Sequence, residues 1–274
     1  MAPRHVDAFL QQIRSGSQQS RRDSEAEAAL DSLPEKTPVC KYDTPSQMEA
    51  AARSVDDGGY CVFLDVPESL IFDDRRKMGI KRADYFPRPK IFIAKMPTKP
   101  HELATGWLVP EITLKMLEMG MRFNTYLANF GTANIAHKEP DLALIPQNLP
   151  SGRTDKWPTL VVETGKSEGH KALDRDARWW VQTSAGQVRV VITIKVSRTR
   201  ITVQRYGQPG KTRAAVIQTI TMVRRGQKPI RVTGSPLRIP FRDVFLRAET
   251  RNQGDFIFTN AELEAWANYV WKYF

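Results

Sequence analysis

Short runs of apolar residues, bounded by proline, glycine or polar residues, recur along the chain from residue 60 onward. Runs of this kind that are rich in Val, Ile and Leu are typical of buried β-strands, whereas amphipathic helices show a period near 3.6 residues. The pattern predicts strands at 60–66, 90–94, 142–145, 160–162, 188–196, 201–206 and 214–223. A large sheet is therefore expected in the middle of the chain.

Other stretches carry the signals of helices. A helix is predicted from about 99 to 119, in which Pro110 should introduce a kink or a break. A second helix, at about 170–184, has apolar residues at the i, i+4, i+7 and i+8 positions of a packed face. Capping boxes that begin at Thr44 and Thr259 predict two further helix starts.

The order of these elements indicates the fold class. The strand–helix–strand pattern over 160–196 is that of a βαβ unit, which joins two parallel strands. We therefore predict an α/β fold: a mixed sheet flanked by helices, with an antiparallel β extension. Residues 1–37 are polar and poor in large apolar side chains, and we predict a disordered tail there. Residues 38–274 are predicted to form one domain, with a core at about 88–206 and a basic β extension and C-terminal helix at 207–274.

Composition narrows the setting in which the protein works. Apolar residues make up 41% of the 274 residues, which is enough for a buried core. The two cysteines, Cys40 and Cys61, form neither a disulfide framework nor a metal cluster, which favours a reducing compartment. The start of the chain lacks the apolar segment of a signal peptide, and no stretch reaches about 18 apolar residues. We therefore expect an intracellular protein, nuclear or cytoplasmic, that is neither secreted nor membrane-bound.

The positive charge of the chain is concentrated in its C-terminal third. The formal net charge is +11, and residues 189–251 contain 15 Lys and Arg against two acidic residues, a local balance of +13. Such asymmetry favours a polyanionic partner, most simply DNA, and the turn with Arg224, Arg225 and Lys228 is the best local candidate for phosphate contact. The alternative is a set of edge strands that Lys and Arg protect from aggregation.

Two acidic residues lie at the ends of neighbouring predicted strands. Asp141 opens the run 142–145, and Glu163 closes the run 160–162. If these strands are adjacent, the two carboxylates meet and repel each other unless a cation neutralises them. A divalent ion such as Mg²⁺ does so with hard oxygen ligands. A Pro-Asp pair before a strand is also ordinary turn chemistry.

The pair Pro140-Asp141, followed by an apolar strand that ends in Glu163, resembles the motif of the PD-(D/E)XK nuclease superfamily. Upstream, Met96-Pro97 followed by a helix that opens with His101-Glu102 resembles one branch of restriction endonuclease-like proteins with a displaced motif lysine. The resemblance covers about residues 88–206 and implies a restriction-endonuclease-like fold. It also implies that Asp141 and Glu163 hold Mg²⁺ (or Mn²⁺), with Glu102 as a further ligand. The same Glu102 is equally explained by the helix dipole.

The chain departs from the family pattern at the lysine that helps to activate the attacking water. The position two residues after Glu163 is Gly165. Lys166, Lys195 and Arg178 are the candidates for a group that has taken over this role, and the sequence alone does not choose among them.

These features support two functional hypotheses and leave a third open. The first is a Mg²⁺-dependent endonuclease that hydrolyses phosphodiester bonds, in DNA rather than RNA, with Asp141, Glu163 and Lys166 or Lys195 at the active site. The second is a catalytically degenerate protein of the nuclease fold that binds nucleic acid or a protein partner; Gly165 favours it. Both allow a homodimer. The third is an unrelated module in which the motif is coincidental.

Overall fold

The structure is a computed structural model, and its contacts divide the chain into two compact units. Unit 1 contains Met1–Thr98 and the separate segment Asn134–Glu139, whereas unit 2 contains Lys99–Ala133 and Pro140–Phe274. The structure describes residues 4–6, 10, 23–55, 59–73, 80, 82–131, 133–166, 170–208, 214–226 and 228–274.

Unit 1 is a five-stranded mixed sheet with a packed core on each of its faces. Its strands, in spatial order, are β1 (Arg4–His5), β2 (Pro38–Lys41), β3 (Tyr60–Leu64), β5 (Ile91–Lys95) and β4 (Arg82–Phe86). Its helices are α2 (Asp23–Asp31), α3 (Pro45–Arg53) and α4 (Glu68–Asp73). Successive side chains of a strand point to opposite faces, so in β3 Val62 packs with α2 while Phe63 packs with α3.

Unit 2 is built on a seven-stranded sheet. In spatial order its strands are β12 (Arg231–Thr233), β11 (Ala215–Val223), β10 (Arg200–Gly207), β9 (Val190–Val196), β8 (Leu160–Lys166), β7 (Leu142–Pro146) and β6 (Leu127–Asn129). Only the β8–β9 pair is parallel, and β10, β11 and β12 continue the sheet as an antiparallel extension. A separate hairpin pairs β13 (Leu237–Ile239) with β14 (Phe256–Phe258).

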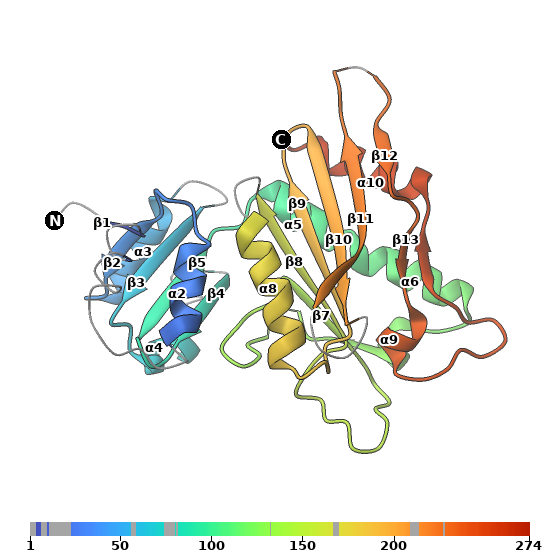
Figure 1. Ribbon diagram of the computed structural model, residues 1–274, viewed down its shortest axis with the longest axis horizontal. Coiled ribbons are helices and arrows are strands. Elements are labelled where there is room, and N and C mark those ends of the chain that lie inside the picture. Colours follow the sequence, from blue (N-terminus) through green and yellow to red (C-terminus); the bar gives the residue numbers. More distant parts are fainter. Residues whose placement is uncertain are drawn as a thin grey trace. The chain divides into compact units, whose positions relative to one another are not determined.

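Helices cover both faces of the unit 2 sheet. The helices are α5 (Lys99–Gly106), α6 (Leu108–Glu118), α7 (Phe123–Tyr126), α8 (His170–Thr183), α9 (Phe241–Phe245) and α10 (Asn260–Trp271). Figure 1 shows α8 in front of the sheet and α5 and α6 behind it. On the rear side Trp107 stacks on Trp266 of α10, with ring centroids 4.8 Å apart. Trp266 belongs to the buried core, and Trp107 packs against it.

The α/β fold class predicted from the sequence is confirmed, including the parallel β8–α8–β9 unit and the antiparallel extension. The predicted helix 99–119 is divided, as expected near Pro110: α5 ends at Gly106 and α6 starts at Leu108, so Pro110 lies in the first turn of α6. A proline is tolerated there because the first N–H groups of a helix have no intrahelical partner.

The structure differs from the sequence prediction at the N-terminus and in the number of units. The predicted disordered tail 1–37 includes residues 11–22, which lie outside the described part, but α2 is an ordered helix whose Ala29 and Leu30 are buried in unit 1. Residues 38–274 were predicted to form one domain, whereas the contacts place the first part of that range in unit 1. In the described part of the chain, no helix is both long and apolar enough to cross a membrane.

Candidate functional site

Asp141 and Glu163 lie opposite each other at one end of the β7–β8 pair. Leu142 pairs with Val162 in the antiparallel register, and the Asp141 N–H donates to the Val162 carbonyl at 3.1 Å. One further step along this register places Asp141 beside Glu163. The two acidic residues singled out in the sequence, here called the acid pair, are therefore neighbours across two adjacent strands.

The Asp141 carboxylate is held by groups of β8 and α5. Its Oδ2 accepts a hydrogen bond of 2.5 Å from the backbone N–H of Thr164 and lies 3.0 Å from Nε2 of His101. The same Nε2 lies 2.9 Å from the Thr164 carbonyl oxygen. Both neighbours of Nε2 are acceptors, so this nitrogen carries a proton and donates to them. The Asp141 side chain has no exposed surface, because these contacts enclose it.

The Glu163 carboxylate is held from the other side of the sheet. Its Oε1 accepts a hydrogen bond of 2.6 Å from the indole N–H of Trp180 on α8, and the residue is 3% exposed. The next residue, Thr164, points to the opposite face, where its hydroxyl bonds to Thr105 of α5 at 2.8 Å. The contacts of the acid pair thus diverge: those of Asp141 lead to α5 and those of Glu163 lead to α8.

Glu102 is the exposed member of this region. It follows His101 in the first turn of α5, and its Oε1 is 3.7 Å from Nδ1 of the His101 ring. Its side chain is 43% exposed, in contrast to the enclosed carboxylate of Asp141. This position next to the helix N-terminus is favourable for a carboxylate because of the helix dipole.

The place of the family's motif lysine is filled by an apolar side chain. A Cβ atom added to Gly165 would lie 3.1 Å from Cδ1 and Cγ of Leu173 on α8. Gly165 points to the same face as Glu163, because the two are separated by one residue in β8. A longer side chain at this position would have to displace Leu173, which is buried.

The proposed replacement residues have different surroundings. Lys195 pairs with Gly165 in the parallel β8–β9 register and so lies one strand away from the motif position. Burial, and secondly the nearby charge of Arg200, lower the pKa of Lys195. Lys166 is the last residue of β8, and its side chain lies outside the described part of the structure. Arg178 is engaged elsewhere, with Asp174 at 2.8 Å and the Ala214 carbonyl at 2.9 Å.

Among the described residues, no group of three or more His, Cys, Asp or Glu is arranged to hold a metal ion. Mg²⁺ also binds through one or two carboxylates together with water, so the acid pair would have to hold it in that way. One oxygen of each carboxylate is already engaged: Oδ2 of Asp141 accepts from Thr164, and Oε1 of Glu163 accepts from Trp180. These hydrogen bonds stabilise the two buried carboxylates where a cation was expected to do so.

Sequence analysis identified some of these partners and missed others. His101 was part of the motif that suggested the family, but its contact with Asp141 was not predicted. Trp180 lies on the packed face that the apolar spacing over 170–184 predicts, and it is buried. Nothing in the spacing indicates that its indole N–H meets Glu163, because that contact depends on how α8 packs on the sheet.

No protein-family model matches the chain, and no curated protein sequence matches it. The site must therefore be interpreted from its own geometry.

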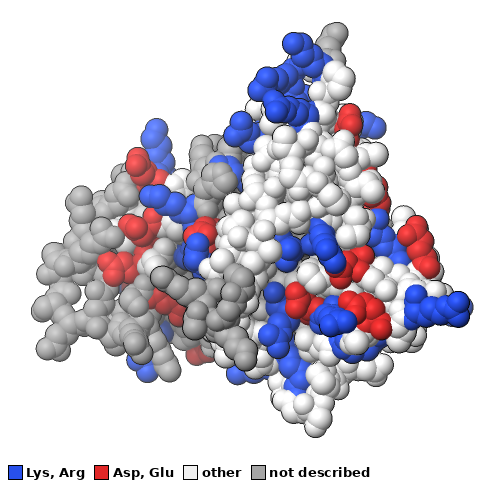
Figure 2. All heavy atoms as spheres, turned by 45° about the vertical axis from the view of Figure 1, so that its right-hand side comes forward, with Lys and Arg blue, Asp and Glu red and all other residues white. Residues whose placement is uncertain are grey.

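A second feature of unit 2 is a group of cations at one end of the extension. The β9–β10 turn carries Arg198 and Arg200, and the segment after β11 carries Arg224, Arg225 and Lys228. We call these five residues the basic surface. Figure 2 shows Lys and Arg gathered at this tip, with little acidic surface beside them in this view.

Two contacts join the turns that form the basic surface. The backbone N–H of Arg224 donates to the Thr199 carbonyl at 2.9 Å, and its guanidinium donates to the Arg198 carbonyl at 3.1 Å. The same guanidinium lies 5.3 Å from the ring centroid of Trp271. The two turns that carry these cations are therefore bonded to each other and hold the charges close together.

Proposed function

We propose that this chain is a non-catalytic nucleic-acid-binding protein, with DNA as its simplest ligand, and that the basic surface is its contact with the phosphate backbone. The observation that carries the proposal is the clustering of Arg198, Arg200, Arg224, Arg225 and Lys228 at one end of the antiparallel extension. Cations that neutralise phosphates release condensed counterions, and this release favours binding without regard to base sequence.

The electrostatics of the neighbouring strand support this proposal. The pKa of Lys195 is lowered by burial and by the charge of Arg200, which is the effect expected where cations lie close together. Like charges held together in a folded protein are unfavourable, and a polyanion relieves the repulsion. If these Lys and Arg residues served only to keep edge strands from aggregating, the bonds by which Arg224 joins the two turns would have no role.

The arrangement of the acid pair supports a structural role for these residues. Glu163 is buried and bonded to Trp180, Asp141 is bonded to Thr164 and His101, and Leu173 fills the space beside Gly165. A buried carboxylate with hydrogen-bond donors is stable, whereas one without donors is costly. The pair joins α5 and α8 to the same strand.

Metal-dependent cleavage of nucleic acid is the second candidate function. It is favoured by the register that places Asp141 beside Glu163 and Lys195 beside Gly165. For the acid pair to hold Mg²⁺, the ion would have to bind through the other carboxylate oxygens or displace the donors Thr164 and Trp180.

The proposal is tested by fluorescence anisotropy of labelled duplex DNA over a series of salt concentrations. Reversal of three charges, Arg224→Glu, Arg225→Glu and Lys228→Glu, should weaken binding to all sequences. It should also flatten the dependence of log K on log salt by up to about 3, because each phosphate contact contributes about 0.9. A double variant that leaves Arg224 intact keeps the bonds between the turns and should show about two thirds of the effect.

A matched control reverses three exposed cations of unit 2 that lie outside the basic surface, Arg122, Lys156 and Arg251. This control changes the net charge by the same amount and should retain most of the affinity and the salt slope. Equal losses in both triple variants, or no loss in the first, would contradict the proposal. Cleavage that requires Mg²⁺ and is abolished by Glu163→Gln would establish the second candidate instead.

A further inference from the structure

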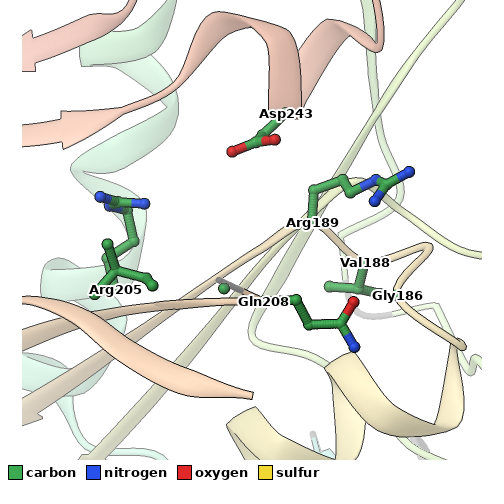
Figure 3. A pocket seen from close by; sticks show the side chains of 8 residues that line it. Gly186, Val188, Arg189, Arg205, Gln208 and Asp243 are labelled. Carbon is green, nitrogen blue, oxygen red and sulfur yellow. The ribbon is translucent and has the colours of Figure 1, made fainter. Parts of the chain in front are cut away.

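A cavity of about 220 Å³ lies in unit 2, and neither residue of the acid pair lines it. It is lined by side chains from β10, β11, α9 and the segment before β9. The polar lining residues are Arg189, Arg205, Gln208 and Asp243, and Val188 and Ile217 are among the apolar ones. Figure 3 shows this cavity and the side chains around it.

Two opposite charges line the cavity without forming an ion pair with each other. The Asp243 carboxylate and the Arg205 guanidinium both extend into the cavity (Figure 3), and no ion pair joins these two described residues. The buried Nε of Arg205 has no hydrogen-bond partner among the described residues. Burial lowers the pKa of Arg205 and raises the pKa of Asp243, and in each case it is the largest cause. Both groups are half-buried, and each affects the charge of the other without a hydrogen bond or ion pair between them.

The apolar lining and the volume restrict the shape of a ligand. Val188 is buried, whereas Ile217 of β11 is 40% exposed and presents apolar surface to the cavity. A cavity of about 150 Å³ admits one benzene ring, so this cavity suits a fused two-ring system and is smaller than typical drug-sized pockets. The lining therefore favours a flat group whose faces are apolar and whose edge is polar.

We propose that this cavity binds a guanine base, as a free nucleotide or as an unpaired base of a bound nucleic acid. The Watson–Crick edge of guanine carries an acceptor, O6, next to donors on N1 and N2. Arg205 donates to O6, and Asp243 accepts from the N1–H and N2–H groups. In nucleic-acid recognition, flipped bases are read in this way, by hydrogen bonds to their Watson–Crick edge and by contact with apolar side chains.

The remaining cation at the cavity suits the phosphate of the same nucleotide. The Arg189 guanidinium points away from the Asp243 carboxylate (Figure 3). Its charge is close enough to Arg153 to lower the pKa of that guanidinium, although burial is the larger cause. A phosphate beside Arg189 would relieve this repulsion between cations.

Guanine fits the cavity better than the other bases or a free amino acid. Adenine presents a donor at N6 beside an acceptor at N1, so its donor would face Arg205 and its acceptor would face Asp243. A small amino acid could match the two charges, but it would leave the surfaces of Val188 and Ile217 without an apolar partner. The binding of a base within a nucleic acid rests on the proposed function, whereas the binding of a free nucleotide does not.

The inference is tested by calorimetric titration of the full chain with guanosine 5′-monophosphate. We expect saturable binding and an affinity for adenosine 5′-monophosphate that is lower by about tenfold or more, the size of a good base-edge contact. Asp243→Asn keeps the shape of the side chain and should reduce the affinity for the guanine nucleotide by about tenfold. It should also improve binding of xanthosine 5′-monophosphate, whose O2 can accept from the new amide.

Arg205→Gln is the second cavity variant and should also weaken binding of the guanine nucleotide. The matched control is Arg251→Gln, which removes an exposed cation outside the cavity and should bind as the wild type does. No saturable binding of guanosine 5′-monophosphate, equal binding of the adenine nucleotide, or wild-type affinity in both cavity variants would overturn the inference. So would glycine competing at similar concentration. Anisotropy with a guanine-free oligothymidylate separates the two proposals: its binding persists if only the cavity assignment fails, and is lost if the basic surface fails.

Discussion

The indole N–H of Trp180 donates a hydrogen bond of 2.6 Å to the carboxylate of Glu163, and this bond joins α8 to the acid pair. It occupies an oxygen that the family resemblance assigned to a metal ion. Glu163 is 3% exposed as a residue, so the bond is shielded from solvent.

Trp180→Phe should destabilise the protein more than Trp266→Phe does. Both substitutions shorten a buried indole of unit 2, but the Trp266 N–H has no hydrogen-bond partner among the described residues. A hydrogen bond to a charged group contributes about 1.5–3 kcal/mol, and its loss leaves a buried carboxylate with one donor fewer. Urea unfolding followed by circular dichroism should therefore show a difference of roughly 1–3 kcal/mol between the two variants. Equal losses would mean that the bond to Glu163 adds nothing to stability.

Gly165→Ala should be destabilising, because the added Cβ meets Leu173 at 3.1 Å. Overpacking of this kind costs about 1–3 kcal/mol. Leu173→Ala alone should cost about 2–5 kcal/mol, because it leaves a cavity. In the double variant each change compensates for part of the other, so the total should be smaller than the sum of the single effects. The free energies of unfolding of the three variants form a double-mutant cycle. An additive result would show that the two positions do not compete for the same space.

Mg²⁺ or Mn²⁺ should not stabilise the free protein. A ligand that binds only the folded state raises the unfolding midpoint as its concentration increases. The oxygens of Asp141 and Glu163 accept hydrogen bonds from Thr164 and Trp180, so we expect the thermal midpoint to be the same with either ion and with a chelator. A shift that grows with ion concentration and disappears in Glu163→Gln would show that the acid pair binds metal after all.

Asp243→Asn should raise the free energy of unfolding near neutral pH. Burial raises the pKa of this carboxyl above its usual value of 3.8, more than the nearby charges of Arg189 and Arg205 lower it. A carboxyl whose pKa is raised by folding binds protons more tightly in the folded state. The ionised carboxyl therefore lowers the free energy of unfolding at pH values above its pKa in the folded state. This effect disappears below its pKa in the unfolded state. The advantage of the variant, measured by urea unfolding, should shrink as the pH is lowered through this range. A constant difference at all pH values would exclude the ionisation of Asp243 as its cause.

Patterns within short stretches of the sequence predicted the starts of two helices and the positions of the buried strands. Thr44 and Thr259 cap helices that begin where the capping boxes predict, and the apolar runs 142–145 and 160–162 become buried strands. Capping and alternation act between residues that are close in the chain, so a short window contains the information. The same patterns do not show whether the strands that carry Asp141 and Glu163 pair, and the structure shows that they do.

The side-chain contacts of these residues depend on how the elements pack together. Whether Glu163 meets a cation or the indole of Trp180 depends on how α8 packs on β8, and whether position 165 has room for a side chain depends on Leu173. The approach of Arg205 to Asp243 and the return of Asn134–Glu139 to unit 1 likewise join segments distant in sequence. Helical spacing fixes which face of a helix is buried, but the direction of one donor on that face is set by the whole packed core, so no short stretch of sequence contains it.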